Sequence, residues 1–316
     1  MNTTRRIAGI VAIALLFSLS LTSCKKDDTN PGDANTAFKI TDAPFDDAAV
    51  SGAFITIADI KLDGVSIQGF TKTTVDVAAY QNGQAKTIGN FNLAGKTYNT
   101  VTFVLDYNTD ANGSAPGSYI LTTGGIKHKL QTTGNEITIA KNFSLNADAS
   151  NSIVADFDLR KMIIAQSGST SDQYDLATTA ELQSSIRVVV ESGTGTINGT
   201  LSDAVSGSAK VVAYAYKKGT FNRTTELQGQ GTSNIEFKNA VSSSTVASNG
   251  NYQLHFLEAG DYEIHFASYK DTNADGKLEL AGTLVVLASG GLDLLNLTLG
   301  ANASVSVNVT ATGVLN

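Results

Sequence analysis

Cysteine is almost absent from this chain of 316 residues, which contains one, Cys24. No disulfide can form within the chain, so packed hydrophobic cores must stabilise the fold even in an oxidising compartment. Tryptophan is absent, there are three prolines, and only 16% of the residues are charged. The formal net charge is −7 and becomes −9 once Arg5 and Arg6 are removed. Because an acidic protein repels phosphates, we expect no nucleic-acid partner.

Several motifs of common enzymes are also missing. The sequence has no Gly-x-Ser-x-Gly elbow, no His-Glu-x-x-His helix and no glycine-rich phosphate loop ahead of a lysine. His128 lies between two lysines and has no acidic neighbour that would make it a catalytic base. We therefore expect no catalytic activity. A carboxylate pair for glycoside hydrolysis stays open as an alternative, because the spacing of such a pair is spatial and not sequential.

The first residues have the features of an export signal. Arg5 and Arg6 precede an uncharged apolar stretch over residues 7–17, which is too short to span a bilayer by the usual requirement of roughly 20 apolar residues. Leu-Thr-Ser-Cys follows, ending at Cys24, and resembles a bacterial lipobox. That resemblance implies removal of residues 1–23 as a lipoprotein signal peptide and attachment to a membrane through lipid on Cys24. An ordinary secretory signal or an uncleaved anchor is the alternative.

The residues after Cys24 predict a tether and a location. Lys-Lys-Asp-Asp at 25–28 resembles the export tag of surface lipoproteins in Bacteroidota-type bacteria, which implies an outer-membrane protein that faces the cell exterior. A solvated charge run is the alternative. The polar sequence TNPGDANT follows, so we expect residues 24–36 to form a flexible lipidated tether.

Short runs of alternating polar and apolar residues dominate the remaining chain and are typical of β-strands between turns. Examples lie at residues 54–57, 101–105, 153–157, 186–190, 211–216, 252–256 and 262–266. We predict an all-β fold with two β-sandwich-type domains in tandem after the signal peptide, and one helical turn near residues 158–164. The polar stretch 191–196 separates the domains, which we place at residues 37–191 and 194–316.

The first predicted domain contains several segments that carry a family resemblance. They are ITDAPFD at 40–46, NLAGKTY at 92–98, VTFVLD at 101–106, VADFD at 154–158 and IRV at 186–188. In this order they resemble domain-of-unknown-function family 4382. The resemblance implies a secreted or lipid-anchored β-domain and no assigned reaction.

Five aspartates in or beside these segments have two interpretations. Asp156 and Asp158 share one face of a strand and could converge with Asp42, Asp46 and Asp47 as oxygen ligands for a cation. In the alternative, which we favour, they have structural roles, because Asp42 in Thr-Asp-Ala-Pro suits a turn.

The second predicted domain contains GTINGT at 195–200, NGNYQL at 249–254 and LEAGDYEI at 257–264. These segments resemble the carboxypeptidase-regulatory, transthyretin-like group of small Ig-like sandwiches. Under this resemblance, two strands form a hairpin about Gly260. Their core face would consist of Tyr252, Leu254, Phe256, Tyr262, Ile264 and Phe266.

The opposite face of that hairpin contains two of the three histidines. With a three-residue turn, His255 and His265 become cross-strand partners near Glu263. Two histidines and a carboxylate can bind zinc or another transition metal. The alternative, which we favour, is an exposed strand face whose polar residues bind no metal.

A candidate calcium loop follows that hairpin. Asp271, Asn273 and Asp275 place side-chain oxygens at the first, third and fifth positions, and the carbonyl of Lys277 would be the next ligand. The twelfth position of an EF-hand-like loop is glycine here, so Glu279 would have to supply the remaining oxygen. An Asn-, Asp- and Gly-rich hairpin turn is an equally good interpretation.

Three functional interpretations remain. The preferred one is a non-catalytic, surface-exposed cell-envelope module that binds or adheres to a glycan or protein ligand. The second is a glycan-binding accessory of a nutrient-uptake system, for which 10 tyrosines and 13 phenylalanines could provide stacking surfaces. The third is a hydrolase with an unrecognised acid pair.

Overall fold

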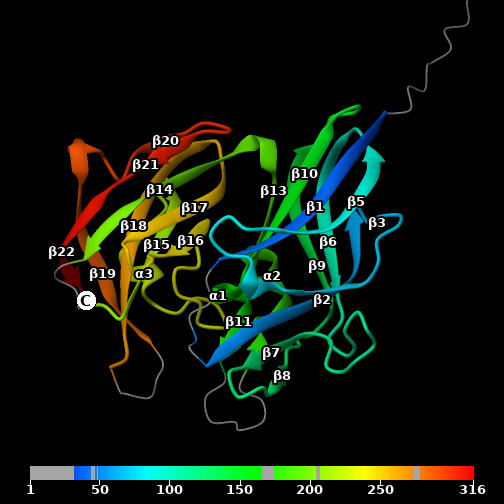
Figure 1. Cartoon of the computed structure of the whole chain (residues 1–316), viewed down its shortest axis with the longest axis horizontal. Coiled ribbons are helices and arrows are strands. Elements are labelled where there is room, and N and C mark those ends of the chain that lie inside the picture. The colour runs from blue at the N-terminus through cyan, green and yellow to red at the C-terminus, as the bar shows by residue number, and fades with distance from the viewer. Residues whose placement is uncertain (1–31, 44–46, 48, 166–173, 204–206, 273–277) are drawn as a thin grey trace, which may run out of the picture. The chain divides into compact units, whose positions relative to one another are not determined.

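Strands make up most of the computed structural model, which describes residues 32–43, 47, 49–165, 174–203, 207–272 and 278–316 (Figure 1). Residues 31–316 belong to one compact unit. Cys24 and the predicted signal peptide lie outside the described residues, so cleavage, lipidation and location stay predictions. In the described part, no helix is long and apolar enough to cross a membrane.

The described residues of the first half form thirteen strands and three short helices. They are β1 (Asp33–Ala43), β2 (Val50–Leu62), β3 (Val65–Ser66), β4 (Thr73–Asp76), η1 (Val77–Ala79), β5 (Lys86–Ala94), β6 (Thr97–Leu105), β7 (Tyr119–Thr122), β8 (Lys127–Lys129), β9 (Glu136–Ser144), β10 (Ser150–Asp158), α1 (Leu159–Met162), β11 (Ile163–Ala165), β12 (Tyr174–Leu176), α2 (Thr179–Ser185) and β13 (Ile186–Val190).

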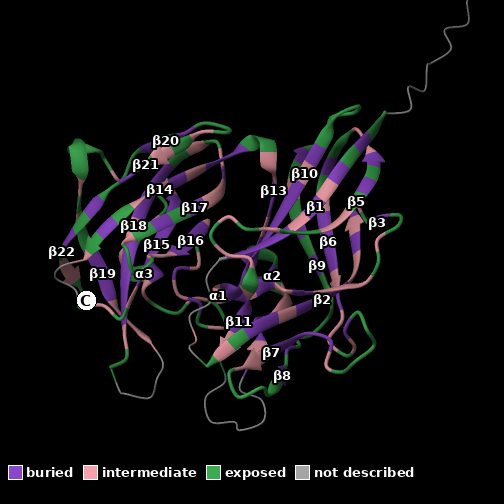
Figure 2. Ribbon diagram, viewed as in Figure 1, coloured by how far each residue is buried: buried purple, intermediate pink, exposed green. Residues whose placement is uncertain are grey.

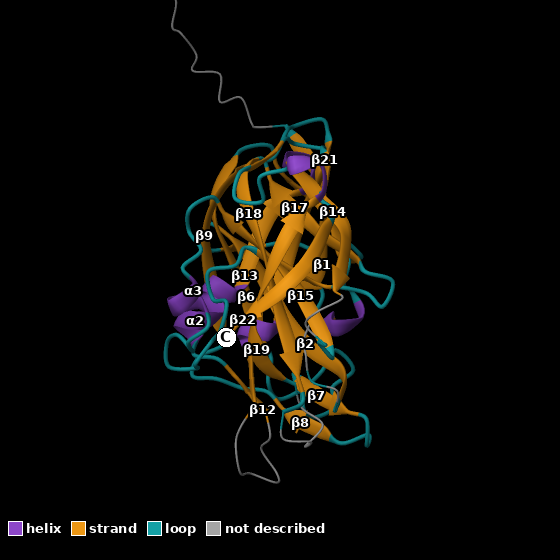
Figure 3. Ribbon diagram, turned by 90° about the vertical axis from the view of Figure 1, so that its left-hand side faces the viewer, coloured by secondary structure: helices purple, strands orange, loops and turns teal. Residues whose placement is uncertain are grey.

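In the second half, the part that the structure describes forms nine strands. Its elements are η2 (Glu191–Gly193), β14 (Thr194–Asp203), β15 (Lys210–Lys217), α3 (Arg223–Glu226), β16 (Ser242–Thr245), β17 (Asn251–Glu258), β18 (Gly260–Lys270), β19 (Glu279–Ala288), η3 (Ser289–Gly291), β20 (Leu297–Leu299), β21 (Ser304–Ser306) and β22 (Val309–Leu315). Figure 3 shows the short helices and the loops at the margins of the strands.

Two sheets enclose the core of the first half. One has the strand order β13-β10-β1-β5, and the other has β8-β7-β2-β6-β9 with β3 and β4 beside β2. β1 and β10 run parallel, although they are far apart in the sequence. Phe103 of β6 meets Phe38 of β1 and Phe157 of β10 across the core, with ring centroids 6.1 and 5.2 Å apart. The alternating apolar residues of both sheets therefore share one interior (Figure 2).

The strands of the second half belong to one nine-stranded sheet with the order β16-β15-β18-β19-β22-β14-β17 and β20 and β21 at its sides. β14 pairs with β21 through its first part and with β22 through its last part. Tyr252 and Phe266 meet in the main core at 5.2 Å, and Tyr214 stacks on Phe237 in a smaller core beside it at 4.2 Å. The prediction of an all-β fold with two β-sandwich-type bodies is confirmed. The domain limits 37–191 and 194–316 stay predictions.

The hairpin predicted about Gly260 is wrong. β17 and β18 follow each other in the sequence, but β17 pairs with β14, whereas β18 pairs with β15, β19 and β20. Phe256 has a φ of 54°, which interrupts the alternation of β17, so Leu257 takes the buried position expected for Phe256. A pattern of two alternating runs shows that strands exist, but it does not show which strands pair.

Two further predictions concern the end of the tether and the position of a helical turn. β1 already starts at Asp33, so the end of the expected tether 24–36 is a strand, because these residues pair with β5 and β10. The helical turn expected near residues 158–164 is confirmed as α1. The transthyretin-like character of residues 194–316 stays a prediction.

Candidate functional site

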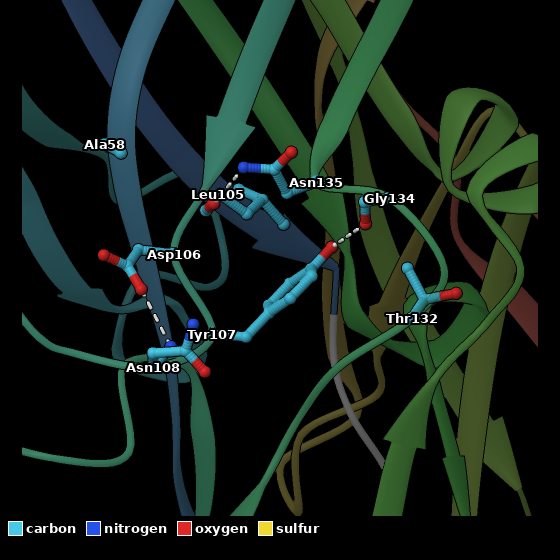
Figure 4. Close-up of a pocket in the computed structure, with 8 residues that line it drawn as sticks. All are labelled: Ala58, Leu105, Asp106, Tyr107, Asn108, Thr132, Gly134 and Asn135. Atoms are coloured by element: carbon cyan, nitrogen blue, oxygen red, sulfur yellow. Dashed lines mark hydrogen bonds between the residues drawn. The ribbon is translucent and has the colours of Figure 1, made fainter.

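A cleft of about 420 Å³ lies where β6 ends and β9 begins (Figure 4). We call it the Tyr107 cleft. Its lining combines one aromatic ring with amide, hydroxyl and carboxylate groups, from Ala58, Leu105, Asp106, Tyr107, Asn108, Thr132, Gly134 and Asn135. The end of a strand and two turns meet here, so the polar side chains can face the cleft without entering the core.

Tyr107 provides the aromatic wall of this cleft. Its hydroxyl donates to the carbonyl of Gly134 at 2.9 Å, which holds the ring across the cleft (Figure 4). Burial, with a smaller contribution from the charge of Asp175, raises the pKa of Tyr107 to about 12. The side chain is therefore neutral at physiological pH and is positioned as a flat apolar surface.

Asp106 is the acidic residue of the cleft, and its carboxylate is already engaged. One oxygen accepts from the amides of Asn108 and Thr109 at 2.8 and 3.0 Å, and the other accepts from Lys72 Nζ at 2.7 Å. Burial alone would raise the pKa of Asp106, but Lys72 and the two amides outweigh it and lower the pKa to about 2. The charge is permanent and compensated, so the cleft favours an uncharged ligand.

The remaining polar groups keep hydrogen-bonding capacity. Asn135 uses its Nδ2 to donate to the carbonyl of Leu105 at 3.2 Å, which leaves its Oδ1. Asn108 uses its Oδ1 to accept from Lys129 Nζ at 3.1 Å, which leaves its Nδ2. An acceptor, a donor and the Thr132 hydroxyl thus surround one ring. The family segment ending at Asp106 was the sole sequence signal near this cleft.

The structure also brings three of the five aspartates together. The parallel pairing of β1 with β10 puts Thr41 opposite Asp156 and Ala43 opposite Asp158, so Asp42 lies close to both carboxylates. Asp46 lies outside the described residues. Asp47 instead accepts from the Tyr174 hydroxyl at 2.7 Å. No three His, Cys, Asp or Glu side chains in the described part could together hold a metal ion.

Basic side chains form ion pairs with two of these carboxylates. Asp158 lies 2.9 Å from Arg160 and 3.1 Å from Lys161, and Asp156 lies 2.6 Å from Arg187. Burial alone would raise the pKa of Asp158, but Arg160 and Lys161 outweigh it and hold that pKa below its usual value. The structural interpretation of these aspartates is therefore supported.

The same basic side chains cross to the second half of the chain and donate to main-chain carbonyls there. Arg160 donates to the carbonyl of Glu236 at 2.6 Å and Lys161 to that of Ala240 at 2.5 Å. Arg187 donates to the carbonyl of Phe256. Basic residues that follow VADFD or lie within IRV thus join residues 33–190 to Glu236, Ala240 and Phe256 of the second half through hydrogen bonds.

Asp42 differs from its neighbours, because the groups that shift its pKa include no basic side chain. Burial, assisted by the charges of Asp156 and Asp158, raises its pKa well above the usual value, against hydrogen bonds from the amide of Leu159 at 3.2 Å and from Gln81 Nε2 at 3.5 Å. The folded state therefore binds the Asp42 proton more tightly than the unfolded state does, and stability falls as pH rises through the interval between the two pKa values.

Replacing Asp42 with asparagine should remove this penalty and keep the acceptor for Leu159. We expect Asp42→Asn to be more stable than the original protein at pH 7, by roughly 1–3 kcal/mol, the usual cost of a desolvated polar group. The difference should shrink below about pH 4, where an ordinary carboxyl group is protonated in both states. Urea unfolding at several pH values measures it, with the exposed Asp293→Asn as control. A pH-independent difference would contradict this explanation.

The three residues of the predicted transition-metal site lie apart or have other partners. His265 pairs with Tyr214 in β15, stacks on Phe221 at 3.7 Å and lies 3.5 Å from Glu263. His255 lies on β17, which pairs with β14 and not with β18. The direct pairing of His255 with His265, on which the metal prediction depended, is therefore wrong.

The predicted calcium loop is described at its two ends. Asp271 and Glu279 are in the described part, whereas Asn273, Asp275 and Lys277 lie outside it. Glu279 accepts from the amide and the hydroxyl of Thr272 at 2.8 and 2.7 Å. β18 and β19 pair on both sides of the loop, which confirms the hairpin. Calcium binding stays a prediction.

Similar solved structures share little sequence with this chain. A candidate carbohydrate-binding protein of Pseudomonas aeruginosa is 17% identical over 37% of this chain and 90% of that chain, with a TM-score of 0.22. A candidate cell-adhesion protein of Bacteroides eggerthii is 11% identical over 90% and 97%, with a TM-score of 0.18. The major pilin subunit of Bacillus cereus is 11% identical over 89% and 71%, with a TM-score of 0.20. Similarity at these TM-scores carries no inference about ligand or activity.

The match to a protein family falls within the first half of the chain. No curated protein matches the chain. Residues 33–178 match the family described as Domain of unknown function (DUF4382). This match includes β1 with its early start at Asp33, and it ends before α2. Residues 33–178 of the chain are therefore a DUF4382 domain.

Proposed function

We propose that the protein is a non-catalytic lipoprotein of the cell envelope that binds a neutral saccharide in the Tyr107 cleft. The observation that carries the proposal is the position of one neutral aromatic ring among amide and hydroxyl groups with unused hydrogen-bonding capacity. Small-molecule sites usually combine an apolar or aromatic wall with a few placed polar groups. A sugar offers the matching surfaces, namely a face of C–H groups and a rim of hydroxyls.

The charges of the cleft support binding over hydrolysis. Glycoside hydrolysis usually needs two carboxyl groups, roughly 5–10 Å apart, one of which can give up a proton near neutral pH. Among the residues that line the cleft, Asp106 is the one carboxylate, and Lys72 together with backbone amides holds it ionised. An ion-paired carboxylate with a pKa of about 2 is a poor general acid.

The proposed location depends on Cys24. Each buried CH₂ of a lipid contributes about 0.8 kcal/mol to membrane binding, so two or three acyl chains on one cysteine would attach the protein almost permanently. The lysine- and aspartate-containing tag that follows supports display on the outer face of the outer membrane. A protein ligand at the cell surface, and with it an adhesive role, is the second candidate, and it rests on the same predicted location.

A titration of the purified full chain with neutral oligosaccharides tests the proposal. We expect Tyr107→Ala to weaken binding at least about tenfold, because aromatic contacts contribute about 0.5–1.5 kcal/mol and hydrogen-bond geometry is lost as well. Tyr107→Phe keeps the ring and should retain most of the affinity. Isothermal titration calorimetry measures both. Equal affinity of the Tyr107→Ala variant and the exposed control Ile126→Ala would refute the site.

A further inference from the structure

A β-bulge at the end of β17 carries a strained aromatic residue. The pairing of β14 with β17 changes register between Gly195, which faces Leu257, and Ile197, which faces Leu254. Thr196 therefore faces both His255 and Phe256, the two-to-one arrangement of a bulge. Phe256 has a φ of 54°, a conformation that bulky side chains rarely adopt. Strain of this kind persists where the surroundings hold it, and it is concentrated at binding sites.

The side chains that hold this bulge belong to the first half of the chain. Arg187 of β13 donates through Nη1 to the carbonyl of Phe256 and through Nη2 to that of His255 at 3.5 Å. Asp156 holds the same guanidinium at 2.6 Å. One forked guanidinium therefore binds both carbonyls of the bulge. Lysine could not replace it, because an ammonium group does not hold its donors in a fixed planar fork.

A cleft of about 520 Å³ lies over the bulge, and we call it the Phe256 cleft. His255 lines it as a fixed neutral ring, because Thr196 Oγ1 lies 3.3 Å from its Nδ1 and Gln253 Oε1 lies 2.7 Å from its Nε2. Burial lowers the pKa of His255. Gly83 packs so closely on the imidazole that a Cβ there would approach it to 2.6 Å.

The Phe256 cleft is polar but carries no uncompensated charge among its lining residues. Its acidic residue, Glu191, is paired with Lys39 at 2.6 Å. Asn198 and Asn302 donate through Nδ2 to the Ser304 hydroxyl and the Ser192 carbonyl, which leaves both Oδ1 atoms as acceptors. Gln253 keeps its Nε2 as a donor, since its Oε1 contacts His255.

These contacts reproduce the chemistry of the Tyr107 cleft on a different sheet. We infer that the Phe256 cleft is a second binding site for neutral saccharide, and that Arg187 is the residue that positions it. The inference takes its ligand class from the proposed function, but it depends on different residues. Phe256 supplies the aromatic surface, and Asn198, Gln253 and Asn302 supply the hydrogen bonds.

Nuclear magnetic resonance of the isotope-labelled full chain can test the two clefts separately. Hexasaccharides of β-1,4-glucan, α-1,4-glucan, β-1,4-mannan and β-1,4-xylan are the probes. Side-chain amide signals of Asn108 and Asn135 report on the Tyr107 cleft, and those of Asn198, Gln253 and Asn302 report on the Phe256 cleft. We expect one of the probes to shift both sets of signals.

Phe256→Gly is the decisive variant, because glycine adopts a positive φ without strain, which offsets part of the packing lost with the ring. It should weaken binding at the Phe256 cleft at least about tenfold and leave the Tyr107 cleft unchanged. Arg187→Lys should weaken the same cleft and spare the other, although it keeps the charge beside Asp156. A merely structural role of Arg187 would not produce this split. Leu287→Ala, exposed on β19, is the matched control.

The outcomes separate the two proposals. Shifts confined to Asn108 and Asn135, or unchanged affinity of Phe256→Gly, would overturn the second site alone. Shifts confined to Asn198, Gln253 and Asn302 would overturn the Tyr107 site and support the Phe256 site. A panel that shifts neither set of signals would overturn both.

Discussion

Asp158→Ala should destabilise the protein by about 3–5 kcal/mol, the cost of removing one partner from a buried ion pair. The carboxylate of Asp158 is 9% exposed and forms ion pairs with both Arg160 and Lys161, whose side chains are 11% and 6% exposed. Without it, two positive charges stay buried and have only main-chain carbonyls as acceptors. The loss should be large because a buried, unpaired charge keeps its full desolvation penalty.

Urea unfolding of the single variant and of the double variant Asp158→Ala/Lys161→Met separates this cause from a general packing defect. Replacing Lys161 with methionine removes one of the uncompensated charges, so the double variant should recover part of the lost stability. The exposed Asp293→Ala should change stability by less than about 0.5 kcal/mol. A double variant that is less stable than Asp158→Ala would show that the charge of Lys161 is not the cause.

Phe103→Ala should cost about 3–5 kcal/mol, the usual range for truncating a buried phenylalanine. Phe103 is fully buried, and its ring contacts Phe38 and Phe157 on the facing sheet. Alanine would leave a cavity between the two sheets of the first half. Because β1, β6 and β10 surround this position, the backbone has little freedom to collapse into the cavity.

Thermal and urea unfolding of Phe103→Ala, Phe103→Leu and Ile126→Ala measures this effect. Leucine fills part of the space, so Phe103→Leu should cost clearly less than the alanine variant. Ile126 is 60% exposed, and its truncation should have almost no effect. If Phe103→Ala and Ile126→Ala unfolded at the same urea concentration, Phe103 would not be a central core residue.

The successful sequence predictions concern features that depend on neighbouring residues. Alternation of polar and apolar residues located strands such as β6 and β10, because side chains on a strand point to opposite faces in turn. The helical turn α1 and the hairpin between β18 and β19 also follow from local patterns. The resemblance to the DUF4382 family was carried by short segments in a fixed order, and the family match over residues 33–178 confirms it for every segment except IRV at 186–188, which lies outside the match.

The failed and missing predictions concern residues that are far apart in the sequence. β17 and β18 are separated by one residue, yet their partners β14 and β15 come from elsewhere in the chain. The bulge at His255 and Phe256 depends on Arg187, which belongs to the other half. Neither cleft could be predicted, because Tyr107 and Asn135 meet only after β6 has paired with β9.

The aspartates show the same difference between what the sequence predicts and what the tertiary structure decides. Their spacing already placed Asp156 and Asp158 on one face of a strand, the single cysteine already excluded an internal disulfide, and the alternation of polar and apolar residues already predicted an all-β body. Only the parallel pairing of β1 with β10 brought Asp42 beside them, and only the docking of residues 236–240 and 256 supplied acceptors for Arg160, Lys161 and Arg187. Backbone geometry imposes periodicity on each strand separately. Pairing and side-chain convergence instead depend on burial and electrostatics summed over the whole folded chain.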